Sequence, residues 1–226
     1  MAAKDFWRFD WDFFGHEVFS PTAADNATFM IADTSAVGTP TYAVVDGSGS
    51  GEIAIDFDNT AEIQNVCLFQ NDKLQYDIDL ITQVEWRVKM NQAAMDAASS
   101  LAFGVTGDRN DAIDSIAQAA LFRVIGADNT TAVVVETDDG TNNNDDVATG
   151  DTLVNAYKDF LISFAAGKDD VRFFINGQPV ATDTTFDMSS YSGSLQLLLQ
   201  LQKTADANTD GVTVDRIAIR GRRETN

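Results

Sequence analysis

The stretch that decides the fold class is VRFFINGQPVA, residues 171–181. Its apolar residues Val171, Phe173 and Ile175 stand two positions apart, which is typical of a strand with one buried face. The polar pair Asn176-Gly177 then interrupts the pattern and predicts a tight turn before a second strand. We therefore expect a β-hairpin here, and the question becomes what kind of protein carries it.

Similar segments recur along the chain, most of them rich in β-branched or aromatic residues and many alternating apolar with polar positions. They lie at residues 27–33, 41–46, 51–58, 62–70, 79–90, 100–107, 120–127, 131–138, 158–166, 171–177, 195–202 and 212–220. Only two short segments, 91–100 and 110–119, have a helical character. The pattern predicts an all-β, two-sheet antiparallel sandwich or barrel with one or two short helices, and no alternation of strands with helices.

The composition narrows the classes of partner. The 226 residues are 44% hydrophobic, enough to bury the core of a single domain, and no apolar run has the length of a membrane-spanning helix. The formal net charge of −20 argues against a nucleic acid or an anionic membrane as partner. The N-terminus lacks the apolar region of a secretory signal. The one cysteine, Cys67, stands in an apolar run and is expected to be a small buried side chain, which fits assembly in a reducing cytosol.

An aromatic segment opens the chain, and we assign residues 1–20 to an N-terminal arm or edge strand. It contains seven aromatic residues: Phe6, Trp7, Phe9, Trp11, Phe13, Phe14 and Phe19. One interpretation is an edge strand whose alternate aromatic side chains share a face. The other is an arm that docks on a partner, which makes Phe6, Trp7, Phe9 and Trp11 candidate partner-binding residues.

The other end of the chain is basic. Arg216, Arg220, Arg222 and Arg223 fall within the last eleven residues. We assign residues 21–221 to the sandwich and 222–226 to a C-terminal tail. A free basic tail would dock on an acidic partner, including a neighbouring copy, and Arg220, Arg222 and Arg223 are the candidate contacts. A solubilising, frayed terminus is the equal alternative.

Residues 136–151, ETDDGTNNNDDVATGD, are strongly acidic, and no lysine or arginine occurs between Arg123 and Lys158. Carboxylate, amide and carbonyl oxygens are ligands that Ca²⁺ prefers, so a calcium loop is one interpretation. The order of residues does not match an EF-hand. We favour a long solvated hairpin loop, and the sequence leaves metal binding open.

Catalytic chemistry has little support. His16 is the only histidine, so histidine-pair metal sites are excluded and a histidine-assisted nucleophile would depend on the N-terminal arm. A glycoside hydrolase needs only two carboxylates, and Glu136 and Asp138 alternate on one strand. The third acid of the β-glucanase pattern, however, would fall on Thr141. We expect no enzymatic activity and no cofactor.

Several motifs resemble the concanavalin A-like (laminin G-like) jelly-roll family. The hairpin positions Val171, Phe173, Ile175, Asn176-Gly177 and Val180 match its V-x-F-x-[IV]-[ND]-G-x-x-V pattern, and residues 210–221 resemble its last strand. Segments 120–124, 133–154 and 157–164 look like the version found in tailed-phage virion proteins. The resemblance covers about residues 80–221 and implies that alternate hairpin residues face the core between two sheets, with Arg172 and Phe174 on the other face.

The resemblance implies a capsid decoration, or cement, protein that binds the major capsid protein on the capsid surface of a virion assembled in the host cytoplasm. A homotrimer would suit a threefold site on such a shell. The alternative is a carbohydrate-binding module or lectin-like host-attachment protein, because this fold also carries lectins. That alternative needs exposed aromatic side chains. Tyr191 and Trp86 are the candidates, although the position of Trp86 in an alternating strand predicts a core residue.

Overall fold

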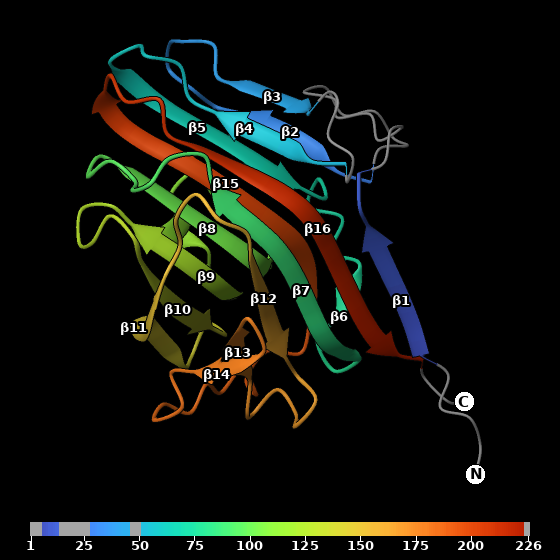
Figure 1. Cartoon of the computed structure of the whole chain (residues 1–226). Helices are drawn as coiled ribbons and strands as arrows, with labels where there is room; N and C mark the ends of the chain where they lie inside the picture. Colours follow the sequence, from blue (N-terminus) through green and yellow to red (C-terminus); the bar gives the residue numbers. More distant parts are fainter. Residues whose placement is uncertain (1–5, 14–27, 46–50, 224–226) are drawn as a thin grey trace.

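Two antiparallel sheets pack face to face in the computed structural model, which describes residues 6–13, 28–45 and 51–223 (Figure 1). The first, called the β16 sheet, has this strand order: β14 (Gln178–Val180), β13 (Arg172–Ile175), β12 (Lys158–Ser163), β7 (Ile81–Met90), β16 (Gly211–Arg222), β4 (Ile53–Asp56) and β3 (Thr41–Val44). A further strand, β1 (Phe6–Trp11), pairs with the C-terminal half of β16.

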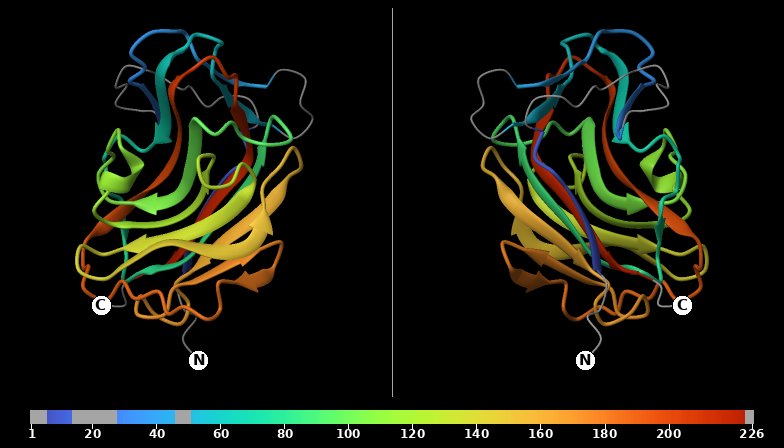
Figure 2. Two further views of the ribbon diagram at one scale, coloured as in Figure 1. Left: turned by 90° about the vertical axis from the view of Figure 1, so that its left-hand side faces the viewer. Right: turned by 90° about the vertical axis from the view of Figure 1, so that its right-hand side faces the viewer.

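The second sheet, called the β15 sheet, has this order: β11 (Asn143–Thr152), β10 (Ala132–Asp138), β9 (Ala119–Ile125), β8 (Ser99–Thr106), β15 (Ser194–Asp206), β5 (Glu62–Phe69) and β2 (Met30–Asp33). A short strand, β6 (Tyr76–Asp77), also pairs with β15. The connection between β15 and β16 carries the chain from one sheet to the other, and Figure 2 shows these two strands diverging into the two layers. The predicted all-β jelly-roll sandwich is confirmed.

Aromatic side chains fill the space between the sheets. Phe122 lies 4.9 Å from Phe160 and 5.2 Å from Phe173, measured between ring centroids, and both contacts are edge-to-face. Phe103 stacks on Phe122 and lies 5.8 Å from Trp86. These contacts join β8 and β9 of one sheet to β7, β12 and β13 of the other, in geometries that aromatic rings favour.

The predicted hairpin is present. Asn176 and Gly177 have φ values of 50° and 76°, as the tight turn between β13 and β14 requires. Val171, Phe173 and Ile175 are buried, whereas Arg172 is exposed and Phe174 half-buried on the other face. The predicted core positions Trp86 and Cys67 are also buried, and burial raises the pKa of the Cys67 thiol.

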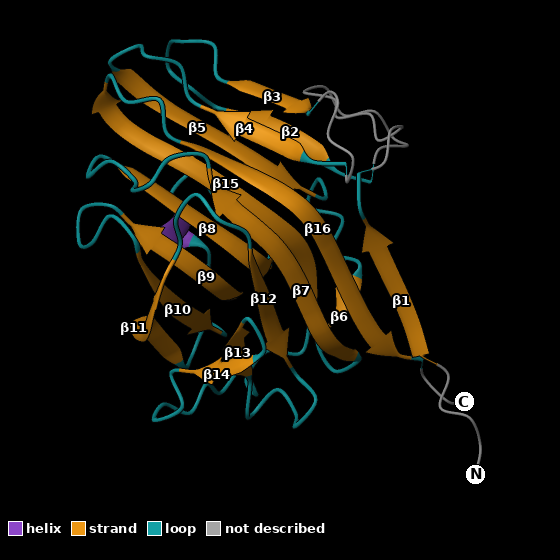
Figure 3. Cartoon of the chain, in the orientation of Figure 1, coloured by secondary structure: helices purple, strands orange, loops and turns teal. Residues whose placement is uncertain are grey.

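The helix predictions are mostly wrong. Residues 91–98 form bends and turns that lead into β8, and in 110–119 the only helix is the single 3₁₀ turn Ile113–Ser115 (Figure 3). Tertiary contacts decide the second case, because Ile113 and Ile116 are buried against the outer face of the β15 sheet. Local helical character is a weak preference that such packing overrides.

The loop predicted in the acidic segment is also wrong, since residues 143–152 form strand β11. This strand pairs with β10 at the edge of the β15 sheet, and most of its side chains are exposed or half-buried. Because an edge strand without a fully buried face needs no regular apolar alternation, its sequence carries no strand signal.

Some predicted features lie outside the described residues. They are His16, Phe14 and Phe19 of the N-terminal arm, the first residue of the predicted strand 27–33, the last residue of the predicted strand 41–46, and residues 224–226 of the predicted tail. Within the described ranges, no helix is both long and apolar enough to cross a membrane.

The aromatic cluster predicts a large stability effect. Phe122→Ala should lower the free energy of unfolding by about 3–5 kcal/mol, because the lost ring leaves a cavity between the sheets. Ile63→Ala, at a side chain that is 54% exposed, should change it by less than about 0.5 kcal/mol. Urea unfolding followed by tryptophan fluorescence would measure both variants. Equal effects would show that Phe122 does not join the sheets as described.

Candidate functional site

A loop crosses the outer face of the β15 sheet between β8 and β9. Residues 107–118 form it, and its buried Ile113 and Ile116 pack on a second apolar cluster. The sheet contributes Met30, Cys67, Phe69, Ala102, Ala119, Leu121 and Leu198 to this cluster. These side chains lie on the face of the sheet that points away from the main core. The apolar cluster therefore fixes the loop on this outer face, where the loop forms a raised wall.

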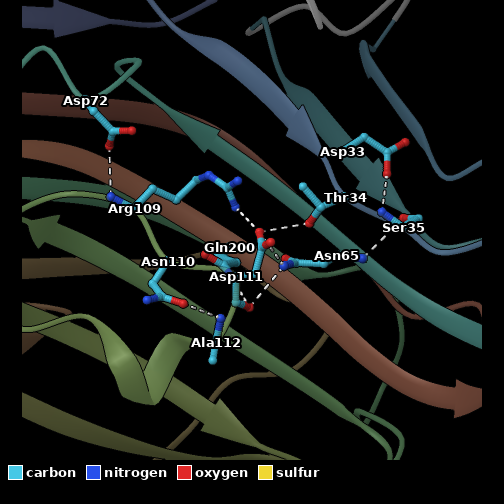
Figure 4. A network of polar contacts seen from close by, with 10 residues as sticks. All are labelled: Asp33, Thr34, Ser35, Asn65, Asp72, Arg109, Asn110, Asp111, Ala112 and Gln200. Carbon is cyan, nitrogen blue, oxygen red and sulfur yellow. Dashed lines mark hydrogen bonds and ion pairs between the residues drawn. The ribbon is translucent and has the colours of Figure 1, made fainter.

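Asp111 of this loop lies at the centre of a polar network (Figure 4). Its backbone carbonyl accepts hydrogen bonds from Asn65 Nδ2 at 3.0 Å and from Gln200 Nε2 at 2.9 Å. Its carboxylate accepts a hydrogen bond from Thr34 at 2.9 Å and pairs with Arg109. Partial burial opposes ionisation of Asp111, but the hydrogen bonds from Arg109 and Thr34 outweigh it and lower the pKa. The network therefore ties the loop to β5 and β15 and to the residue that follows β2.

A groove of about 720 Å³ lies beside this network. Polar and small apolar side chains line it: Thr34, Ile63, Asn65, Ala97, Ala98, Ser99, Ser100, Asp111, Ala112, Asp114, Arg123, Ile125, Ala127, Gln202, Lys203 and Thr204. A second hollow of about 290 Å³ shares Asp114, Arg123 and Ile125 with it. The shared residues make the two hollows neighbouring lobes of one site, called the β15 groove below.

The second lobe is acidic. Six carboxylates line it, together with Asn143, Ile125 and Arg123: Asp114, Asp128, Glu136, Asp138, Asp145 and Asp146. Arg123 is buried and contacts Asp114 and Glu136, each at 2.5 Å, and Asp146 at 3.3 Å. Burial raises the pKa of Glu136, which the charge of Arg123 only partly offsets. A ligand entering this lobe meets more acceptors than donors.

Three buried polar atoms near the groove have no hydrogen-bond partner among the described residues: Asn65 Oδ1, Gln200 Oε1 and Arg123 Nε. The two amides are oriented by Asp111, because its carbonyl oxygen needs donors and therefore takes their NH₂ groups. Asn65 and Arg123 line the groove itself. A buried polar atom without a partner costs free energy, and such atoms at a groove indicate a place where a ligand or water completes the bonding.

No metal site emerges from the acidic segment. In the parts of the chain that the structure describes, no group of three or more histidine, cysteine, aspartate or glutamate side chains is arranged to hold a metal ion. The second lobe also contains the guanidinium of Arg123, whose charge would repel a cation. Its carboxylates instead surround an arginine.

The predicted partner-binding residues come together on a different surface. Strands β1 and β16 are antiparallel, with Phe6 opposite Arg222 and Trp7 opposite Gly221. The indole Nε1 of Trp7 donates to the carbonyl of Arg222 at 2.9 Å. A methyl group at Gly221 would lie 2.1 Å from this indole, so the glycine is what allows the ring to lie across β16. Phe9 and Trp11 continue the aromatic row along β1.

The predicted free basic tail is wrong for the arginines that the structure describes up to residue 222. Arg220 and Arg222 belong to β16, and Arg220 pairs with Glu85. Arg216 pairs with Asp10 of β1 at 2.8 Å. The charges of Arg216 and Arg220 are therefore paired with carboxylates on neighbouring strands of the same sheet. Arg223 follows the strand and is exposed.

Sequence reasoning missed the residues of the β15 groove. Asn65, Asp111, Gln200 and Arg123 come from distant segments, and no spacing in the sequence connects them. The predicted sugar contacts do not lie there. Trp86 is in the core, and Tyr191 is half-buried with its hydroxyl bonded to the carbonyl of Ser194.

Solved structures of known proteins share this fold. The carbohydrate recognition domain of Emp47p has a TM-score of 0.57 and 10% identity, over 85% of this chain and 87% of that one. A protein of unknown function from Shewanella oneidensis MR-1 has a TM-score of 0.56 and 13% identity, over 100% and 92%. The potassium-bound carbohydrate recognition domain of Emp46p has a TM-score of 0.53 and 11% identity, over 85% and 88%. No family model and no curated protein matches the sequence. At these identities the likeness shows the fold alone, a lectin-like jelly roll.

Arg123 should be essential to the stability of the acidic lobe. Arg123→Met should lower the free energy of unfolding at about pH 7 by about 3–5 kcal/mol, because Glu136 is left buried without a counter-charge. Since the folded pKa of Glu136 is raised, the loss should shrink as the pH falls through that pKa and the carboxyl takes up a proton.

The double variant Arg123→Met with Glu136→Met serves as the control and should recover most of the loss, since both buried charges are gone. Urea unfolding at several pH values would measure these variants. A deficit in the single variant that does not depend on pH would contradict this account of the lobe.

Proposed function

We propose that the protein is a non-catalytic carbohydrate-binding module and that the β15 groove binds a glycan. The observation that carries the proposal is the set of buried polar atoms without partners, since Asn65 and Arg123, which line the groove, contribute the atoms Oδ1 and Nε to this set. One is an acceptor and the other a donor. A sugar hydroxyl is both donor and acceptor, so it can complete either of them.

The lining suits a polyhydroxyl ligand in two further respects. Planar amide, carboxylate and guanidinium groups can each bond to neighbouring hydroxyls. Ile63, Ala112 and Ile125 offer apolar surface for the C–H face of a sugar ring. No tryptophan, tyrosine or phenylalanine lines either lobe. Hydrogen bonding and aliphatic contact would therefore provide the affinity, without the aromatic stacking on Tyr191 or Trp86 that was predicted from the sequence.

The acidic lobe sets the class of glycan. Six carboxylates around one arginine repel an anionic ligand, while their oxygens accept bonds from hydroxyl or ammonium groups. We infer that neutral or amino sugars bind and that sialylated or uronic-acid glycans do not. The fold neighbours Emp47p and Emp46p, whose domains are named for carbohydrate recognition, support this class of function.

A glycan panel tests the proposal. The protein should bind a neutral or amino-sugar glycan, and both Asn65→Ala and Asp145→Ala should weaken binding at least about tenfold, or about 1.4 kcal/mol. Asp169→Ala is the matched control, because it removes the same charge from an exposed loop between β12 and β13 and should leave binding unchanged. Thermal melting would show whether each variant is folded. A panel with no binder, or equal losses in all three variants, would refute the proposal.

The capsid-decoration function stays a prediction, as do its major capsid protein partner, homotrimer and location on the virion surface. It derives from the resemblance of residues 80–221 to virion proteins. Binding of the purified protein to capsids that lack it would test this prediction. Since a glycan-binding protein can also be a virion component, glycan binding would not contradict a place on a capsid.

A further inference from the structure

Strand β1 leaves one edge of the β16 sheet open. It pairs with β16 on one side, and no strand in the described part of the chain pairs with its other side, which faces outward at the right of Figure 1. The strand is also apolar for an edge, because Phe6 is 58% and Phe9 49% exposed. An open, aromatic edge of this kind is a template for pairing with another strand.

We propose that β1 pairs with β1 of a second copy of this chain, antiparallel and across a twofold axis. The sequence of the strand, FWRFDW, is self-complementary in this arrangement. With Phe9 opposite Phe9 of the second copy, each Arg8 stands opposite an Asp10, and each Trp7 opposite a Trp11. Opposite charges and aromatic pairs directly across two strands both stabilise a sheet.

The charges select one register. A shift of two residues in one direction would place Arg8 opposite Arg8, and a shift in the other direction would place Asp10 opposite Asp10. Shifts by an odd number would turn the apolar side chains to the wrong face. Only the register centred on Phe9 keeps the faces and joins opposite charges.

Each face of β1 carries exposed side chains that a second copy could contact. Trp7, Phe9 and Trp11 form a row, with ring centroids 5.6 and 5.8 Å apart, on the face that packs on Tyr76. A second copy would cover the exposed part of this row. Arg8 and Asp10 lie on the other face, where they pair with each other at 2.6 Å within one chain and are each 40% exposed. The exposed part of each side chain is where the second copy would add its own Asp10 or Arg8.

The net charge does not prevent this contact. Each chain carries a formal charge of −20, but at physiological salt the repulsion between exposed charges is largely screened beyond about 8 Å. The Arg8–Asp10 pairs would act within contact distance. The β15 groove lies on the other sheet, so the proposed dimer leaves it open and is independent of the proposed function.

Light scattering and sedimentation equilibrium over a range of concentrations up to millimolar test the dimer. The wild-type protein should reach twice the chain mass of 24.5 kDa. Arg8→Asp should raise the dissociation constant at least about tenfold, because two attractive pairs become repulsive. Inside the chain, the variant loses the Arg8–Asp10 ion pair, while the new aspartate stands opposite Arg220 of β16. Arg172→Asp is the control, since it makes the same charge change on β13 and should not alter the mass.

A complementary variant tests the register. Asp10→Arg combined with Arg216→Glu reverses the internal pair and should be monomeric alone, because Arg8 then faces an arginine across the axis. Mixed with Arg8→Asp, it should form a heterodimer. A wild-type monomer at every concentration, a trimer, a dimer that Arg8→Asp leaves intact, or a mixture without heterodimer would overturn the proposal.

Discussion

The edge-to-face contact between Phe122 and Phe160 joins the two sheets, and its consequences reach the outer face. Successive residues of a strand point to opposite sides, so a core position for Phe122 places Arg123 on the outside of the β15 sheet. The loop 107–118 packs on the same outer face through Ile113 and Ile116. Arg123 is therefore enclosed at a fixed point, and the position of the groove follows from the packing of the core.

A buried guanidinium needs nearby anions, and this requirement explains why the acidic segment places carboxylates around Arg123. Glu136 and Asp146 reach Arg123 from β10 and β11, while Asp114 reaches it from the loop. The carboxylates outnumber the arginine, and burial raises the pKa of both Glu136 and Asp146. The same excess that costs stability gives the lobe its capacity to accept hydrogen bonds, so structure and ligand preference have one electrostatic origin.

The fold could be predicted from the sequence because a strand with one buried face has apolar residues at every second position. Val171, Phe173 and Ile175 alternate since the face that they share is covered by the other sheet. Strand β11 lacks this alternation, because all of its side chains are exposed or half-buried. The 3₁₀ turn at Ile113 depends on packing against distant residues of the sheet. The terminal residues that the sequence singles out lie side by side in β1 and β16, but no sequence pattern gives the register in which they pair.

The groove could not be predicted, because its members are joined only by the fold. Asn65 and Gln200 are ordinary polar residues in apolar strands until both are seen to donate to Asp111. Their unpaired oxygens depend on the direction of each amide, which no sequence pattern records.

Strand β11 has a consequence for how crowded solutions of the protein should behave. It is the open edge of the β15 sheet, where unpaired backbone groups would normally invite strands from other molecules. Asp145, Asp146 and Asp151 place negative charge along this edge, so approaching copies repel each other there. The acidic segment thus disfavours edge-to-edge pairing of β11 between copies, and with it aggregation.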